Sequence, residues 1–293
     1  MSNSLPKVSV VCAWYNRAQY IVESINSILN QDYNNLEIII VNDGSPDEKV
    51  VSILDRFSSD KVKVIHQDNQ GFTKAITNAI AHSSGDLIAI HGAGDISYPT
   101  RISKLVERIS LDENSVAVGS GTVQCPAGYS FRKRYFQPRS SCNSISLSKN
   151  MPFVHGTVMF DRAAYEKVGG YDSRFKYCAD WDLFFKLVSI GNIVSVNEFL
   201  YEQKIFSDGF SFSPEHKFKQ IWFRERAVNR CEDSRNMLDE SEKFLVNINS
   251  SDPIYFQYSL NFFMKSLFKF DFRNSLEWFR LMVLQVKNKS KKY

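Results

Sequence analysis

The chain has 293 residues, which suits one large domain or one domain with a smaller appendage. Its formal net charge of +4 is too mild for a nucleic-acid-binding protein, and 43% hydrophobic residues are enough to fill a core. The five cysteines are scattered without a C-x-x-C pair, so we expect a reducing, cytoplasmic compartment and neither a zinc site nor a disulfide framework. No run of about 18 apolar residues occurs, so neither a membrane span nor a signal peptide is expected.

In the first third of the chain, predicted strands alternate with predicted helices. Nearly continuous apolar runs are typical of parallel strands covered on both faces, and they occur at 7–13, 36–41, 62–66 and 87–91. Apolar residues at helical spacing predict helices at 20–29, 46–57, 72–82 and, after Pro99, from Arg101 onward. This alternation is the pattern of βαβ units, so we expect an α/β fold built on a mostly parallel sheet.

Polar or glycine-rich loops follow the ends of these predicted strands. They are Tyr15-Asn16, Asp43-Gly44, residues 68–71 and residues 92–95. The carboxyl ends of parallel strands share one edge of a doubly wound sheet, and ligands bind at that edge. A tight turn without a ligand would explain any one of these loops. Their coincidence at one edge favours a ligand site.

The pattern changes after about residue 115. Shorter ordered segments are expected at 116–118, 130–136, 153–160 and 167–171. Residues 138–150 are polar and rich in serine, which is typical of a mobile loop. A helix is expected at 180–188, and it opens with the acids Asp180 and Asp182. Beyond Pro214 the spacing of aromatic residues predicts further helices.

Several motifs together resemble glycosyltransferase family 2. They are Val8–Asn16, Ser27–Gln31, Leu36–Ser45, Asn69–Ala75, Gly85–Ala89, Ile96–Arg101, Gly169–Asp172 and Ala179–Leu183, in the family's order and spacing. The resemblance covers residues 6–210 and implies a GT-A fold, a Rossmann-like sheet flanked by helices. It also implies an inverting enzyme that moves a sugar from a nucleotide diphosphate donor to an acceptor hydroxyl, as in bacterial surface-polysaccharide or glycolipid synthesis.

The resemblance implies a set of nucleotide-binding residues. They are Ala13, Tyr15, Asn16, Asp43, Gly71, Lys74, Ala93 and Gly94. Tyr15 would stack on the base, and Asp43 would accept the base's N–H. These two contacts favour a uridine nucleotide, and a thymidine nucleotide is the second choice. Lys74 would meet phosphate or ribose. The alternatives are a core tyrosine, an Asx turn before Gly44 and a solvated lysine.

The resemblance assigns the general base to Asp180, which would remove the proton of the acceptor hydroxyl. The alternative for Asp180 is a helix cap, and Asp182 is the reserve candidate. The family's first acid is replaced by Ala179, which should lower the pKa of the base relative to a paired arrangement. His155 and Trp181 are expected on the acceptor side.

The chain departs from the family where Asp-x-Asp normally holds a divalent cation, because it reads Gly92-Ala93-Gly94-Asp95. Lys204 also stands where a histidine is usual. Three hypotheses follow. We favour a transferase with little need of metal, in which Lys204, Lys74 or backbone amides neutralise the leaving diphosphate. The others are a transferase in which Asp95 still holds Mg²⁺ or Mn²⁺, and a degenerate binding or scaffold protein. In the favoured reading, replacing Lys204 costs more activity than replacing Asp95.

The resemblance also divides the chain into parts with different partners. We expect a GT-A catalytic domain at 1–212, with a nucleotide-binding half at 6–115 and an acceptor half at 116–212, and a helical region at 213–293. The expected partners are a nucleotide-sugar donor and a glycan or lipid-linked acceptor, without nucleic acid. The C-terminal helices are expected to pack on the catalytic domain, and peripheral contact with the inner face of the membrane is the alternative.

Overall fold

The computed structural model describes residues 5–127, 133–136, 141–142 and 153–206, with isolated residues between 220 and 283. The chain divides into two compact units, Met1–Lys204 and Ile205–Tyr293. The predicted helical region 213–293 and the predicted loop 138–150 lie almost wholly outside the described residues. Among the residues that are described, no helix is long and apolar enough to span a bilayer.

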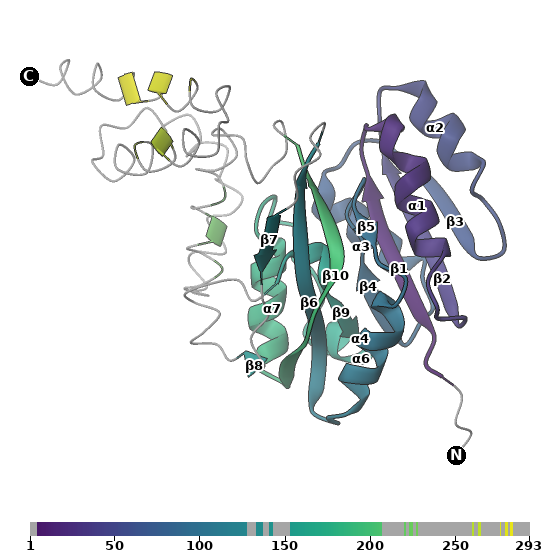
Figure 1. The fold of residues 1–293 in the computed structure, drawn as a ribbon, viewed down its shortest axis with the longest axis vertical. Coiled ribbons are helices and arrows are strands. Elements are labelled where there is room, and N and C mark those ends of the chain that lie inside the picture. Colours follow the sequence, from purple (N-terminus) through teal and green to yellow (C-terminus); the bar gives the residue numbers. More distant parts are fainter. Residues whose placement is uncertain are drawn as a thin grey trace, which may run out of the picture. The chain divides into compact units, whose positions relative to one another are not determined.

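The first half of the larger unit is the predicted parallel sheet. Its strands are β1 (Val8–Trp14), β2 (Leu36–Asp43), β3 (Val62–Gln67) and β4 (Leu87–Ile90), in the spatial order β3-β2-β1-β4. The connecting helices are α1 (Ile21–Leu29), α2 (Glu48–Asp55) and α3 (Phe72–Ala81) (Figure 1). The register pairs Trp14 with Asn42 and Asp43 with Gln67, so the carboxyl ends of β1, β2 and β3 lie level at one edge.

The second half extends this sheet with antiparallel strands. The added strands are β5 (Ile96–Ser97), β6 (Ser115–Pro126), β7 (Lys133–Phe136), β8 (Ser141–Cys142), β9 (Met159–Asp161) and β10 (Asn192–Ile205). Strand β9 pairs antiparallel with both β4 and β6, and β10 carries β5 at its end. The helices here are α4 (Arg101–Ser110), α6 (Arg162–Lys167) and α7 (Ala179–Val188). The α/β fold class is confirmed, and the sheet is parallel in its first half and antiparallel beyond it.

The core lies between the sheet and the helices on one face. Alternate side chains of β1, namely Val8, Val10, Cys12 and Trp14, are buried together with apolar residues of α1, α2 and α4. This alternation follows from the period of two along a strand, and burial of both faces explains why the run is apolar throughout. Helix α3 packs against β1 and β2 through buried residues such as Ile76 and Ile80.

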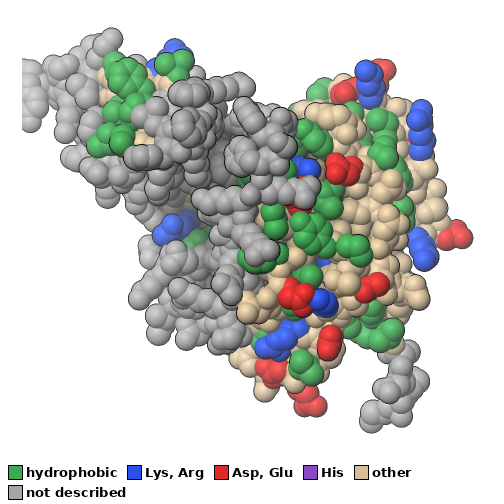
Figure 2. Space-filling model, viewed as in Figure 1, with side chains coloured by type: hydrophobic (Ala, Val, Ile, Leu, Met, Phe, Trp, Pro, Cys, Tyr) green, Lys and Arg blue, Asp and Glu red, His purple; other side chains and the backbone are tan. Residues whose placement is uncertain are grey.

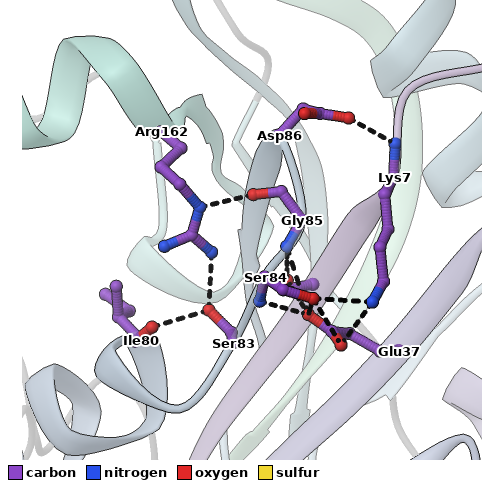
Figure 3. A network of polar contacts seen from close by, with 9 residues as sticks. Lys7, Glu37, Ile80, Ser83, Ser84, Gly85, Asp86 and Arg162 are labelled. Atoms are coloured by element: carbon purple, nitrogen blue, oxygen red, sulfur yellow. Dashed lines mark hydrogen bonds and ion pairs between the residues drawn. The ribbon is translucent and has the colours of Figure 1, made fainter.

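A polar network ties together the amino ends of the parallel strands, opposite the predicted ligand edge (Figure 3). Glu37 on β2 accepts hydrogen bonds from Lys7 Nζ (2.7 Å), Ser9 Oγ (2.6 Å) and Ser84 N (2.6 Å). Burial acts to raise the pKa of Glu37, but these donors outweigh it and lower that pKa to about 2. Helix α6 joins this network through Arg162, whose guanidinium donates to the Gly85 carbonyl (2.5 Å). The frame is therefore fixed at the edge away from the loops.

Several elements were not predicted, among them β5, β8, α6 and the long strand β10. No strand was expected at 192–205, where β10 runs, and residues 162–167 form the helix α6. The segment 167–171, expected to be an ordered return of the chain, is the end of α6 followed by Gly169 and Gly170, both with positive φ. Helix α6 has only six residues, so its periodicity is too short to recognise, and its N-cap Asp161 is the last residue of β9.

Candidate active site

Tyr15 lies where β1 ends, and its side chain is 45% exposed. The turn around it is anchored on both sides. Trp14 is buried and donates from Nε1 to the carbonyl oxygen of Asn16 (2.6 Å). Asn16 has a φ of 58° and donates from its backbone N to Ser45 Oγ (2.8 Å). The structure therefore places Tyr15 on the surface of the ligand edge, and the alternative of a core tyrosine is wrong.

Asp43 ends β2 and holds the loop that precedes α3. Its Oδ1 accepts from Gln67 Nε2 (2.8 Å) and from the backbone N of Gln70 (2.8 Å), and its Oδ2 accepts from the backbone N of Gly71 (2.9 Å). The Asx turn at Gly44 is made by Asn42, whose Oδ1 accepts from Ser45 N (3.3 Å). Asp43 is thus a buried carboxylate that orders the β3–α3 loop at the same edge as Tyr15.

Helix α3 begins at this loop. Gly71 is its N-cap, and the side chain of Lys74 in the first turn is exposed. Thr73 in the same turn donates from Oγ1 to the Phe175 carbonyl (2.7 Å), which joins α3 to the segment that leads into α7. Lys74 therefore lies on the predicted edge, where its charge is solvated and open to a ligand.

The Gly92–Asp95 loop follows β4, and its one carboxylate points into the protein. Asp95 is 7% exposed, and its Oδ2 accepts from Tyr201 Oη (2.7 Å) while its Oδ1 accepts from Lys204 N (2.8 Å). The backbone N of Gly92 donates to Tyr201 Oη (2.8 Å). A Cβ at position 92 would lie 2.3 Å from Asp95 Oδ2, and Gly94 has a φ of +87°, so both glycines are required by this turn.

The surroundings of Asp95 are buried and polar. Burial raises the pKa of Asp95 to about 7, although hydrogen bonds from Tyr201 and Lys204 oppose the rise. Arg101 is completely buried 5.0 Å above the Tyr201 ring, and it donates to the carbonyls of Ile90 and Gly156 (both 2.8 Å). Asp95 is therefore part of the framework that joins β4, α4 and β10.

The residues present do not fit the divalent cation that the fold family implies. Gly92 and Gly94 have no side-chain ligand atoms, and both oxygens of Asp95 accept hydrogen bonds from the protein. Within the described ranges, no group of three His, Cys, Asp or Glu side chains is placed to hold a metal ion. The expectation that Asp95 is a metal ligand is corrected, because its carboxylate is directed at Tyr201 and β10.

Lys204 lies beside this loop at the end of β10. Its Nζ forms an ion pair with Glu202 Oε1 (2.9 Å), and Glu202 is itself buried. Burial acts to lower the pKa of Lys204, but the hydrogen bond and charge of Glu202 outweigh it and raise that pKa. Lys204 is therefore a cation whose charge is shared with Glu202. The expected ranking of Lys204 over Asp95 gains no support from this arrangement.

Asp180 lies in the first turn of α7. The helix cap is Cys178, which makes no side-chain capping bond, so Asp180 is not the N-cap. Asp180 is partly exposed and accepts at Oδ1 from Trp181 N (3.0 Å). Burial raises the pKa of Asp180, while the nearby His155 and the Trp181 N–H oppose the rise. The raised pKa thus comes from removal of water rather than from a neighbouring acid, which Ala179 cannot supply.

Asp182 faces the interior of the protein instead. Its side chain is fully buried, and Oδ2 forms an ion pair with Lys186 Nζ (2.7 Å). The same Nζ donates to the Gly170 carbonyl (2.6 Å). Burial and pairing of this kind leave no access for an acceptor hydroxyl, so the reserve role for Asp182 is corrected to a structural one.

His155 and Trp181 lie in the half of the domain that carries α7. His155 Nε2 is 2.6 Å from Tyr171 Oη, and the edge of its ring meets Phe72 at 5.6 Å between centroids. Trp181 lies 6.4 Å from Phe185 on the same helix. Sequence reasoning assigned no role to Phe72, Tyr171 or Tyr201. Phe72 and Tyr171 stand in the motifs Asn69–Ala75 and Gly169–Asp172, but the residues that they contact lie elsewhere in the chain.

The described surface agrees with the mild net charge. On the face drawn in Figure 2, basic side chains are interspersed with acidic ones rather than gathered into a continuous stripe. A stripe of Lys and Arg is the usual feature of nucleic-acid-binding domains. This face of the described residues therefore carries no such feature.

The curled α/β sheet, with loops gathered at the carboxyl edge, has the GT-A fold. Residues 9–169 match the Glycosyl transferase family 2 model, and the chain belongs to that family. It is 32% identical over 214 residues to the glycosyltransferase EpsE of Bacillus subtilis, covering 71% of this chain and 76% of EpsE. The family resemblance of the sequence is confirmed.

Other similar proteins are longer. The chain is 25% identical over 253 residues to chondroitin synthase of Pasteurella multocida, covering 83% of this chain and 26% of that enzyme. The crystal structure of S. aureus TarS 1–349 in complex with UDP superposes with a TM-score of 0.60 at 17% identity, covering 87% of this chain and 75% of TarS 1–349. At this identity the likeness to TarS establishes the fold.

Proposed function

We propose that this protein is an inverting transferase that moves a sugar from a uridine diphosphate donor to an acceptor hydroxyl in surface-polysaccharide or glycolipid synthesis. One observation carries the proposal: a series of contacts joins Asp43 at the predicted ligand edge to His155, which interacts electrostatically with Asp180. Asp43 holds the N–H of Gly71, the next residue Phe72 packs on His155, and His155 interacts with Asp180. A glycan or lipid-linked acceptor, met at the inner face of the membrane with help from residues 213–293, completes the proposal.

In the proposed reaction, Asp180 removes the proton of the acceptor hydroxyl as its oxygen attacks the anomeric carbon. The bond from that carbon to the diphosphate oxygen breaks, and the nucleoside diphosphate leaves with the electron pair. The raised pKa of Asp180 makes its carboxylate a stronger base than an exposed aspartate. Positive charge on this edge comes from Lys74 and from Lys204, with backbone N–H groups of the Gly92–Asp95 loop nearby.

The donor class is tested by calorimetry with UDP, dTDP, GDP and ADP. We expect UDP to bind most tightly, because Tyr15 is exposed for stacking on the base, and Asp43 orders the loop at the same edge by accepting from the backbone N–H groups of Gln70 and Gly71. Solved TarS structures contain UDP and UDP-GlcNAc, which supports the choice of nucleotide. Tyr15→Ala should weaken UDP binding about tenfold, and Tyr15→Phe, the matched control, should not. Tighter binding of GDP than of UDP would contradict the assignment of a uridine nucleotide as the donor.

Metal dependence is tested by removing metal. We expect transfer to continue in excess EDTA at a substantial fraction of its rate with Mg²⁺, because the Gly92–Asp95 loop supplies no free carboxylate. The control is the thermal melting curve in EDTA, which should be unchanged. Complete loss of transfer, restored by Mn²⁺, would contradict a mechanism with little need of metal.

A second function is favoured by the same loop. A degenerate nucleotide-sugar-binding or scaffold protein would explain why the Asp-x-Asp position reads Gly-Ala-Gly-Asp and why Asp95 serves the framework. The two functions separate in one pair of assays. If UDP raises the melting temperature while neither transfer nor donor hydrolysis occurs with any nucleotide sugar, the protein binds without catalysing.

A further inference from the structure

His155 occupies a position between the donor edge and the proposed base. Its ring meets Phe72, the first residue of α3, at 5.6 Å and Phe184 of α7 at 6.5 Å, both edge to face. Phe184 is one turn beyond Asp180, so the two side chains lie on the same side of α7. The imidazole therefore packs on aromatic rings of α3 and α7, and Phe184 connects it to the side of α7 that carries Asp180.

The Tyr171 hydroxyl fixes the orientation of this ring. Tyr171 Oη is 2.6 Å from His155 Nε2, and the two rings meet at 5.8 Å. Tyr171 is held in turn by Tyr165, whose hydroxyl accepts from the backbone N of Tyr171 (3.2 Å) and whose ring lies 5.7 Å away. The imidazole is thus held by a second, buried layer formed by Tyr171 and Tyr165.

The protonation states of these groups are consistent with one arrangement. Burial lowers the pKa of His155 and raises that of Tyr171 well above its ordinary value, so both are neutral near pH 7. A neutral Tyr171 can donate its hydroxyl proton to Nε2, which places the ring proton of His155 on Nδ1. Asp180 interacts electrostatically with both residues.

We propose that His155 is a positioning residue for Asp180, held in one orientation by Tyr171 and packed between Phe72 and Phe184 so that the base meets the acceptor hydroxyl in a fixed place. The inference rests on the proposed function, because it assumes that Asp180 is the base. It assigns His155 to the rate of proton removal and not to the affinity for donor. It also links the start of α3, which follows the loop that Asp43 orders, to the helix that carries the base.

The test is steady-state kinetics of four single variants. His155→Ala should lower kcat about 10- to 100-fold with the donor KM and UDP affinity unchanged, since only the step that uses Asp180 is affected. His155→Gln keeps an amide near the position of Nε2 and should recover part of the rate. Tyr171→Phe should lower kcat in the same direction. Tyr33→Phe is the matched control: it removes the hydrogen bond from a buried tyrosine hydroxyl to the Pro6 carbonyl, away from His155, and kcat should stay near wild type.

A double variant decides whether His155 acts through Asp180. Asp180→Asn with His155→Ala should be no slower than Asp180→Asn alone, because groups that act as a unit are not additive. Independent losses, or an equal fall with Tyr33→Phe, would overturn the inference in favour of a general packing role. If Asp180→Asn is slow while His155→Ala and His155→Gln are both fast, this inference fails and the proposed function stands. If Asp180→Asn is as fast as wild type, the assignment of the base fails with it.

Discussion

Replacing Asp180 with asparagine is expected to lower kcat by about 10²-fold or more, while UDP affinity stays nearly unchanged. Asparagine keeps the shape and can still accept from Trp181 N, but it cannot take up a proton. Asp172→Asn is the matched control, because it changes a neighbouring carboxylate that pairs with Arg174 (2.8 Å). Single-turnover kinetics with a UDP-sugar measures the effect. Near-normal turnover in Asp180→Asn would move the base elsewhere.

The pH dependence of transfer provides a second readout for Asp180. Burial raises the pKa of this carboxyl, so the active, deprotonated form appears at a higher pH than for an ordinary aspartate. The rate should therefore rise with pH through that raised pKa and then level off. The residual rate of Asp180→Asn should lack this rise. An unchanged profile in the variant would show that another group titrates.

Replacing Asp95 with alanine is expected to lower the free energy of unfolding by about 3 kcal/mol. The change leaves the buried Tyr201 hydroxyl and the Lys204 N–H without their acceptor. Urea unfolding followed by fluorescence measures the loss. Asp60→Ala, at an exposed position, is the control and should stay within about 0.5 kcal/mol of wild type.

The same carboxyl predicts how stability depends on pH. The pKa of Asp95 is about 7 in the folded protein and is raised from the ordinary value of 3.8. Between these values the unfolded chain releases its proton and the folded protein keeps it, so the contribution of Asp95 to stability is full below about pH 4 and is lost as pH rises through 7. In Asp95→Asn this decline should disappear. Equal slopes of stability against pH in wild type and Asp95→Asn would contradict the burial of a protonated carboxyl.

The parallel half of the fold could be predicted from the sequence because its information is local. Each apolar run that marks a strand of the sheet from Val8 to Ile90 is bounded by a loop with polar or glycine residues, and those loops mark the ligand edge. The burial of Asp95 could not be predicted, because its partner Tyr201 lies 106 residues away on β10, in the antiparallel half of the sheet. Local spacing carries no information on such a contact.

The two acids of α7 show the same limit within one helix. Spacing of two residues places Asp180 and Asp182 on different sides of a helix, and this much is evident from the sequence. Which side faces the interior depends on the position of Lys186 and of the Gly170 carbonyl that it contacts. His155 was expected near the acceptor, but its partner Tyr171 and its neighbour Phe72 become adjacent only when α3 and α7 pack into one domain.

The tight turn after β4 also restricts how this protein can evolve. An aspartate at position 92 would collide with the carboxylate of Asp95, since even its Cβ would stand 2.3 Å from Oδ2, and an aspartate at position 94 would have to adopt a φ of +87°. Neither single substitution can restore an acidic pair while Asp95 faces Tyr201. An acidic pair at this turn would therefore require Asp95 and one of the glycines to change together, so the effects of substitutions at these positions are expected to be epistatic.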